Sequence, residues 1–218
     1  MFLFVQQWEI LKGKEVEYTD FILKKCLPIM AELGLNVIGA FHMIIGSGPR
    51  ISAVSLADDL SNLQKGIESA EFIEMTRALR AFVHRYSNAV LKSTGRVGVD
   101  GYGIELGTWR FNQYYDLIQG AEAEYTQFLQ SEHIPIFARL GIRIKAEWQV
   151  VLGTGLRILL EGITASPVDT AKAMMSNDFR QLRHELLSNY VRNYSSRILA
   201  PTGMVEVTYM LGEMTRAL

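Results

Sequence analysis

The chain contains one sequence pattern twice, and this internal repeat constrains its fold more than any other feature. Residues 13–34, GKEVEYTDFILKKCLPIMAELG, return without a gap at residues 120–141 as GAEAEYTQFLQSEHIPIFARLG. In the same register, IIGSGPRI at 44–51 corresponds to VLGTGLRI at 151–158. Similarity at one fixed offset over most of a chain indicates two structural units of one design.

Each copy reads as strand, helix, strand, strand, helix, strand. Runs of β-branched and aromatic residues predict the strands, and apolar residues at three- and four-residue spacing predict the helices. The first copy is expected to have strands at 2–10, 36–45, 51–55 and 96–99, a helix within 13–34 and a mostly helical segment at 61–91. The second copy is expected to have strands at 109–118, 143–152, 157–163 and 204–211, a helix within 120–141 and a mostly helical segment at 168–199. Pro28 and Pro135 should kink or restart the first helix of each copy.

The glycine-rich stretch GVDGYG at 98–103 separates the copies. Such stretches are typical of linkers, so we expect two domains, residues 1–100 and residues 101–218. The glycines of IIGSGPRI and VLGTGLRI lie between two predicted strands, whereas a dinucleotide-binding loop needs its glycines between a strand and a helix. Both stretches are therefore predicted to be hairpin turns, in which glycine adopts positive φ without steric cost.

A βαββαβ unit is the ferredoxin-like arrangement, an antiparallel sheet of four strands with two helices on one face. The strand at 36–45 is apolar on both of its faces, since Val37 and Phe41 alternate with Ile38 and Ala40. The sheet face away from the helices must therefore also be covered, and the second copy can cover it. We expect an α+β fold in which two tandem ferredoxin-like repeats form an intramolecular α+β barrel.

Composition excludes several classes of protein. The 218 residues are 49% hydrophobic and 21% charged, which is typical of a globular protein with a substantial core. The net charge of −1 provides no basic field for nucleic acid or for an anionic membrane. The single Cys26 cannot form an internal disulfide, which fits a reducing compartment. With no signal-peptide pattern at the start, we expect a soluble, cytoplasmic protein.

The pattern WEILKGKEVEYTDFI, followed by LPIMAELGLNVIGAFHMIIGSGPRI, resembles the NIPSNAP domain of the dimeric α+β barrel superfamily. In that family a strand ends in a lysine-glycine or proline-glycine turn, an acidic-aromatic helix follows, and a Leu-Gly pair precedes a strand rich in glycine and tryptophan. Here Lys12 and Gly13 form the turn, and Trp8 stands where the family usually has tyrosine. The second copy resembles the domain too, with Trp148 in the strand position.

The resemblance implies a small ligand in a pocket between each sheet and its own helices. Some relatives are cofactor-free oxygenases of aromatic compounds, some are isomerases, and some are heme enzymes in which a histidine from a helix facing the sheet binds the iron. The sequence places His84 and His184 on the second helix of their copies, so either is a candidate axial ligand of a non-covalent heme. A solvent-exposed helical histidine is the alternative for both. No pair of histidines has the spacing of a zinc-binding helix, so no metal site is predicted.

Two residues are candidates for a catalytic base. His42 lies in the middle of an apolar strand, and Gln149 takes its place in the second copy. Glu147 lies beside Trp148 in the corresponding strand, and burial would raise the pKa of its carboxyl group and suit it to proton abstraction. The alternatives are a core histidine bonded to backbone for His42, and an exposed polar strand face for Glu147.

Aromatic and amide side chains recur on one face of the first strands and at the ends of the repeats. A planar apolar wall with one amide suits a flat organic ligand, although packing is the commoner use of such a face. The candidate ligand-binding residues are Gln6, Trp8, Tyr86, Trp109, Gln113, Tyr115 and Tyr194.

These observations favour a protein that binds a small, mostly apolar organic molecule in one or both repeats. The alternatives are a cofactor-independent oxygenase or isomerase of a cyclic compound, with His42 or Glu147 as the base, and a heme protein. Because the barrel fold also assembles through sheet edges and helices, a homo-oligomer is a further prediction. Both repeats remain candidates for the functional pocket.

Overall fold

The computed structural model describes residues 1–105 and 107–201, which form two compact units. The first unit comprises Met1–Met43, Gly48–Lys92 and Val151–Thr154. The second comprises Ile44–Ser47, Ser93–Val150 and the described residues from Gly155 onward. Each unit is thus built mainly from one sequence repeat, and the main break between them lies after Lys92.

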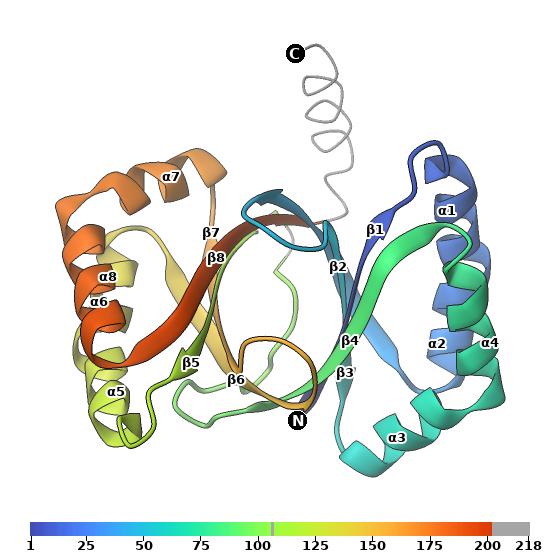
Figure 1. Ribbon diagram of the computed structural model, residues 1–218, viewed down its shortest axis with the longest axis horizontal. Helices are drawn as coiled ribbons and strands as arrows, with labels where there is room; N and C mark the ends of the chain where they lie inside the picture. Colours follow the sequence, from blue (N-terminus) through green and yellow to red (C-terminus); the bar gives the residue numbers. More distant parts are fainter. Residues whose placement is uncertain (106, 202–218) are drawn as a thin grey trace. The chain divides into compact units, whose positions relative to one another are not determined.

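The first unit has an antiparallel sheet in the order β4-β1-β3-β2, with helices on one face (Figure 1). Its elements are β1 (Phe2–Ile10), α1 (Glu15–Phe21), the π-helix η1 (Ile22–Cys26), α2 (Leu27–Glu32), β2 (Asn36–Ile45), β3 (Ile51–Ala57), α3 (Leu60–Glu68), α4 (Ala70–Leu79) and β4 (Val83–Ser93).

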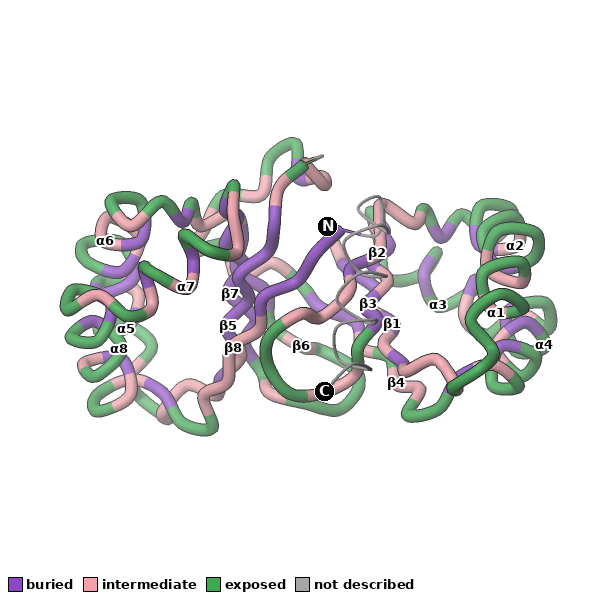
Figure 2. The backbone as a smooth tube through the Cα atoms, turned by 90° about the horizontal axis from the view of Figure 1, so that it is seen from above, coloured by how far each residue is buried: buried purple, intermediate pink, exposed green. Residues whose placement is uncertain are grey.

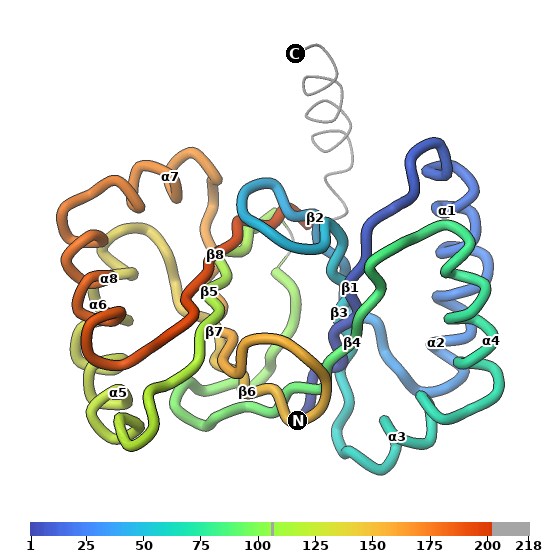
Figure 3. Tube along the Cα trace, in the orientation of Figure 1, coloured from blue at the N-terminus to red at the C-terminus, as the bar shows by residue number. Residues whose placement is uncertain are grey.

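The second unit repeats this design, and its strands follow the order β8-β5-β7-β6. Figure 3 shows the chain leaving β7, passing through α7 and α8 and returning along β8. Its elements are β5 (Trp109–Leu117), α5 (Glu122–Phe128), the π-helix η2 (Leu129–His133), α6 (Ile134–Arg139), β6 (Arg143–Gly153), β7 (Ile158–Thr164), α7 (Pro167–Met175), α8 (Asn177–Asn189) and β8 (Val191–Pro201). The expected α+β fold of two ferredoxin-like repeats is confirmed.

The last element of each repeat differs from the sequence prediction. The helical segments end at Leu79 and Asn189, and residues 83–93 and 191–201 form β4 and β8 instead of continuing as helix. Residues 96–99, expected as the last strand of the first copy, are not a strand, and residues 204–211 lie outside the described part of the chain. Pairing with β1 or β5 satisfies the backbone of these segments, and this tertiary contribution overrides local propensity.

The two prolines restart the first helix of each repeat, as expected. Pro28 and Pro135 are the second residues of α2 and α6, and they cannot donate a backbone hydrogen bond to the preceding turn. A π-helical turn comes directly before each of these helices and ends at Cys26 or His133. Both of these end residues are buried, at 6% and 1% exposure.

Both hairpins place glycines where only glycine fits comfortably. Gly46 and Gly153 have φ values of 132° and 109°, which confirms the predicted turns. A Cβ atom on Gly153 would lie 2.6 Å from the backbone oxygen of Asn88, so this glycine also permits a close approach of two backbone segments in the first unit. The sequence indicated the turn but not this contact.

Buried residues gather along the strands and on the helix sides turned toward them (Figure 2). All seven residues of β7 are buried, which confirms that neither face of this strand meets water. None of the helices in the described ranges combines the length and apolar character needed to cross a membrane.

Candidate functional site

In the first unit, residues predicted to bind a ligand meet between the sheet and the helices and bond to one another. Gln6 Nε2 donates to Tyr86 Oη at 2.8 Å, and Trp8 Nε1 donates to Tyr18 Oη at 3.0 Å. The rings of Trp8 and Tyr86 stack with their centroids 6.2 Å apart. Tyr18 belongs to α1, so these contacts join the sheet to its helical layer.

A β-bulge in the last strand of each unit positions the tyrosine of this arrangement. Where β4 changes register against β1, Arg85 has a left-handed φ of 54°, and where β8 changes register against β5, Asn193 has a φ of 56°. A bulge redirects the side chains next to it. The next residues are Tyr86 and Tyr194. Both lie in strands, and not in helices as the sequence suggested.

The second unit contains the same arrangement. Tyr194 Oη donates to Gln113 Oε1 at 3.1 Å, and the Tyr194 and Tyr115 rings stack with an interplanar angle of 7°. Gln113 and Tyr115 are 2% and 0% exposed, and Trp109 joins the same apolar core at 7%. The structure thus brings together four residues that the sequence predicted as ligand contacts.

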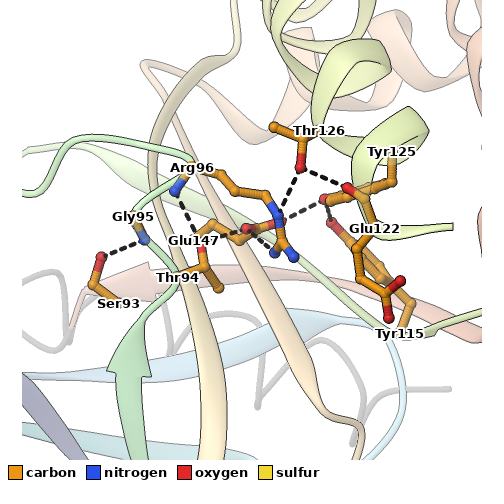
Figure 4. Close-up of polar contacts among 9 residues, drawn as sticks. All are labelled: Ser93, Thr94, Gly95, Arg96, Tyr115, Glu122, Tyr125, Thr126 and Glu147. Carbon is orange, nitrogen blue, oxygen red and sulfur yellow. Dashed lines mark hydrogen bonds and ion pairs between the residues drawn. The ribbon is translucent and has the colours of Figure 1, made fainter. Parts of the chain in front are cut away.

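Glu147, on β6, is fully buried at the centre of a polar network (Figure 4). Tyr125 Oη donates to Glu147 Oε1 at 2.5 Å. On the other carboxylate oxygen, Thr94 Oγ1 donates at 2.5 Å and Arg96 Nη1 at 2.8 Å. Because Glu147 has 0% exposure, the alternative that it lies on an exposed polar strand face is wrong.

Arg96 is a partly exposed member of this network. Its side chain is 18% exposed, and its guanidinium lies 5.3 Å from the centroid of the Tyr125 ring. Its Nε atom also donates to Thr126 Oγ1 on α5 at 3.1 Å (Figure 4). Arg96 therefore ties the segment after β4 to both the sheet and the first helix of the second unit.

The carboxylate fixes the direction of the tyrosine hydrogen bonds. A carboxylate paired with Arg96 only accepts, so the Tyr125 hydroxyl hydrogen is directed to Glu147. Tyr115 Oη, 2.5 Å from Tyr125 Oη, must then be the donor of that bond. A chain of hydrogen bonds thus runs from Tyr115 through Tyr125 to Glu147. The oxygen of Tyr115 keeps lone pairs that can accept a hydrogen bond from a further donor.

Both tyrosines of this chain stay protonated at neutral pH. Burial, more than any other cause, raises the pKa of Tyr115 and of Tyr125 well above the usual value, and the negative charge of Glu147 raises both further. Burial also raises the pKa of Tyr194 to about 12. The site therefore offers hydroxyl groups rather than phenolates.

The first unit lacks this network. By the sequence repeat, Trp8, Tyr18 and Ala40 take the places of Tyr115, Tyr125 and Glu147. A single hydrogen bond, from Trp8 to Tyr18, stands where the second unit has a chain that ends on a buried carboxylate. Since the same fold forms with these apolar substitutions, folding alone does not require the buried glutamate.

His133 is a further functional candidate, which lies at the end of η2 and is buried rather than at the surface. It is 1% exposed, its ring stacks on Phe137, and its Nε2 atom lies 3.2 Å from Gln113 Nε2. Its Nδ1 atom is buried without a hydrogen-bond partner. Burial lowers the pKa of the imidazole to about 3, so the ring is neutral at pH 7.

His42, the other candidate base, lies in the first unit. It pairs with Ile51 in β3, and Trp8 pairs with the same residue from the other side, so all three side chains share one sheet face. Burial lowers the pKa of His42, and its Nδ1 atom has no partner. Its role as a base remains a prediction.

The two candidate heme ligands are exposed. His84 lies on β4 and not on a helix, and its Nε2 atom is 3.1 Å from Glu9 Oε2. His184 lies on α8 as expected, at an exposed position. Neither fits a heme held between a sheet and its helices, because the ligand of such a heme must be a buried side chain. Among the described residues, no three His, Cys, Asp or Glu side chains cluster as a metal site would need.

Sequence reasoning missed Tyr125, Arg96 and His133. Tyr125 belongs to the repeated EYT sequence, so its recurrence as Tyr18 was a usable signal. His133 matches Cys26 in the repeat, but the π turn that directs both inward has no simple sequence signature other than the following proline. Arg96 was assigned to a strand, and nothing in the sequence indicates its contact with Glu147.

Comparison with known proteins shows the fold and leaves the family open. No protein-family model matches the chain, and no curated protein matches it. An anthrone oxidase-like protein is 9% identical, with a TM-score of 0.61 over 92% of this chain and 90% of its own. A heme-binding protein from Thermus thermophilus is 9% identical, with a TM-score of 0.56 over 97% of this chain and 94% of its own. This chain therefore shares the fold of these proteins.

A NIPSNAP family protein is also among the structures that match part of this chain. A NIPSNAP family protein from Agrobacterium tumefaciens is similar to 43% of this chain and 93% of its own length, at 20% identity. The TM-score of 0.36 is too low to carry an argument, so membership of the NIPSNAP family stays a prediction.

Proposed function

We propose that the second unit binds a small, mostly apolar organic molecule between its sheet and its helices, and that the Tyr115–Tyr125–Glu147 chain supplies the polar recognition. The observation that carries this proposal is the fully buried Glu147, which accepts from Tyr125, Thr94 and Arg96 where the first unit has Ala40. Burying a carboxylate disfavours folding unless it is compensated, and the first unit folds without one, which supports a purpose beyond packing for Glu147.

The chemistry of the site indicates the class of ligand. The parallel rings of Tyr115 and Tyr194 provide a flat apolar wall, and Gln113 provides an amide beside it. The oxygen of Tyr115 can accept a hydrogen bond, and the Nδ1 atom of His133 lacks a partner in the same layer. A flat molecule that carries a hydroxyl group, such as a phenol or a hydroquinone, matches these groups.

Copying the first repeat into the second should abolish binding. The double variant Tyr115→Trp and Glu147→Ala reproduces the residues of the first unit, so it should fold and lose the affinity for any phenolic ligand of the wild type. Thermal-shift and NMR titrations against phenols, quinones, aromatic acids and fatty acids measure this. Tyr18→Phe, a change in the first unit, is the matched control and should leave affinity unchanged. Equal affinity of the double variant, or no ligand among these classes, would refute the proposal.

A proton-transfer enzyme is the second candidate, and the hydrogen-bond chain favours it. A substrate hydroxyl that donates to Tyr115 could pass its proton through Tyr125 to Glu147, which would act as the base of an isomerase or a cofactor-independent oxygenase. Tyr125→Phe interrupts this chain and leaves the ring in place. It should reduce turnover of a bound phenol by about 100-fold or more with little change in its dissociation constant. Unchanged turnover would reject the relay.

A further inference from the structure

A separate feature of the second unit lies apart from the glutamate network. A surface cavity of about 320 Å³ lies where α5 begins and α8 ends. This volume is near the lower limit of small-molecule sites. The cavity is lined by Gln119, Gly120, Ala121, Glu124, Asn189 and Tyr190. None of these residues takes part in the Tyr115–Tyr125–Glu147 chain.

The cavity combines an aromatic ring with negative charge. Tyr190 packs against Phe128 with ring centroids 4.8 Å apart, and its backbone oxygen accepts from Ile118 N at 2.9 Å, so the ring is held in place. Glu124 lines the cavity, and the lining residues include no Lys or Arg. Burial and the charges of Glu185, Glu132 and Glu124, in that order, raise the pKa of Tyr190.

The first repeat shows what is different about this cavity. Its counterparts of Gln119 and Ala121 are Lys12 and Lys14. Lys14 Nζ lies 3.1 Å from Glu17 Oε1, so the counterpart of Glu124 is neutralised by an ion pair.

In the second repeat both lysines are gone, and within the described residues no ion pair joins Glu124 to a basic side chain. Phe82 takes the place of Tyr190, so both repeats have the ring and the carboxylate, and only the first has the lysines. The second unit thus has the carboxylate without its internal cation.

We propose that this cavity binds an organic cation, an alkylammonium or quaternary ammonium group, in the place of the missing lysine. The cation lies over the ring of Tyr190, which attracts it through its negative face. Glu124 supplies the opposite charge, and the side-chain oxygens of Gln119 and Asn189 accept from an N–H or O–H of the ligand. This proposal is independent of the ligand proposed for the glutamate network.

Choline and its neutral isostere 3,3-dimethyl-1-butanol test the proposal directly. NMR titration of the wild-type chain should show saturable shifts at Asn189 and Tyr190 with choline, and at least tenfold weaker shifts with the isostere. Ala121→Lys restores the lysine of the first repeat and should weaken choline binding at least tenfold. Gln130→Lys, which adds the same charge at an exposed position on η2, should leave binding within about twofold of the wild type.

Two ring variants separate the cation–π contact from general charge attraction. Tyr190→Phe keeps the ring and copies Phe82, so it should retain choline binding, whereas Tyr190→Leu should lose it. Equal binding of choline and the isostere, or full binding by Ala121→Lys, would overturn the proposal. Because the phenol titration uses a different ligand and different residues, either proposal can fail without the other.

Discussion

An Arg96→Met variant is expected to lose about 3 to 5 kcal/mol of the free energy of unfolding, because it leaves a buried carboxylate without its charge partner. Glu147 is 0% exposed, whereas Arg96 is 18% exposed. The carboxylate cannot turn to water when the guanidinium is removed. Thr94 and Tyr125 still donate to it, but they are neutral and compensate only in part.

The reverse change should be milder. In Glu147→Gln the side chain of Arg96 is already partly exposed, and it keeps the Tyr125 ring and Thr126 as contacts. The double variant, Arg96→Met with Glu147→Gln, should be more stable than Arg96→Met alone, since it removes the stranded charge. Urea unfolding of the four proteins at pH 7 gives the coupling free energy. A loss in Arg96→Met no larger than that in Glu147→Gln would contradict this account of the network.

The stability of the second unit should fall in acid because of His133. The pKa of the imidazole is about 3 in the folded protein, against 6.5 when it is unperturbed. The unfolded chain therefore binds a proton more readily between these two values. The contribution of the neutral ring is fully present above pH 6.5 and is lost as the pH falls toward 3. It amounts to about 5 kcal/mol at most, since one pKa unit corresponds to about 1.4 kcal/mol.

His133→Cys is the variant that tests this expectation, because the first repeat has Cys26 at the same place. Urea unfolding at a series of pH values from 7 to 4 measures the free energy of each protein. The wild type should lose more stability over this range than the variant, whatever the difference between them at pH 7. Parallel pH profiles would show that the ring of His133 is not held neutral. The carboxylates common to both proteins cancel in this comparison.

The repeat made the fold predictable. Identical glycines and prolines at matched positions indicated the hairpins and the helix restarts. These features depend on the residues at the turn or restart itself, so they can be predicted from local sequence. The last strands were missed because Val83 and Val191 begin them directly after helical segments with similar composition. Their strand conformation is imposed by pairing with β1 and β5, which no local pattern reports.

The candidate site was predictable in part for the same reason. Gln113, Tyr115 and Tyr194 were identified by their recurrence and by their shared parity, which the structure brings into contact. Glu147 could be identified as unusual, but its burial could not, because Arg143, Lys145 and Gln149 suggested an exposed face. A bulge in β6, between Ile144 and Ala146, shifts the register and breaks this simple alternation.

The π turn that ends at His133 holds one more residue than an α-helical turn between the same neighbours. Loss of one residue there would leave Pro135 without a backbone donor as before, but it would rotate everything before the turn by about 100° relative to the residues after it. The glutamine contact of the histidine would then vanish while the strands kept their places. The turn therefore makes the interior chemistry of each repeat sensitive to the smallest change in chain length, independently of the sheet that supports it.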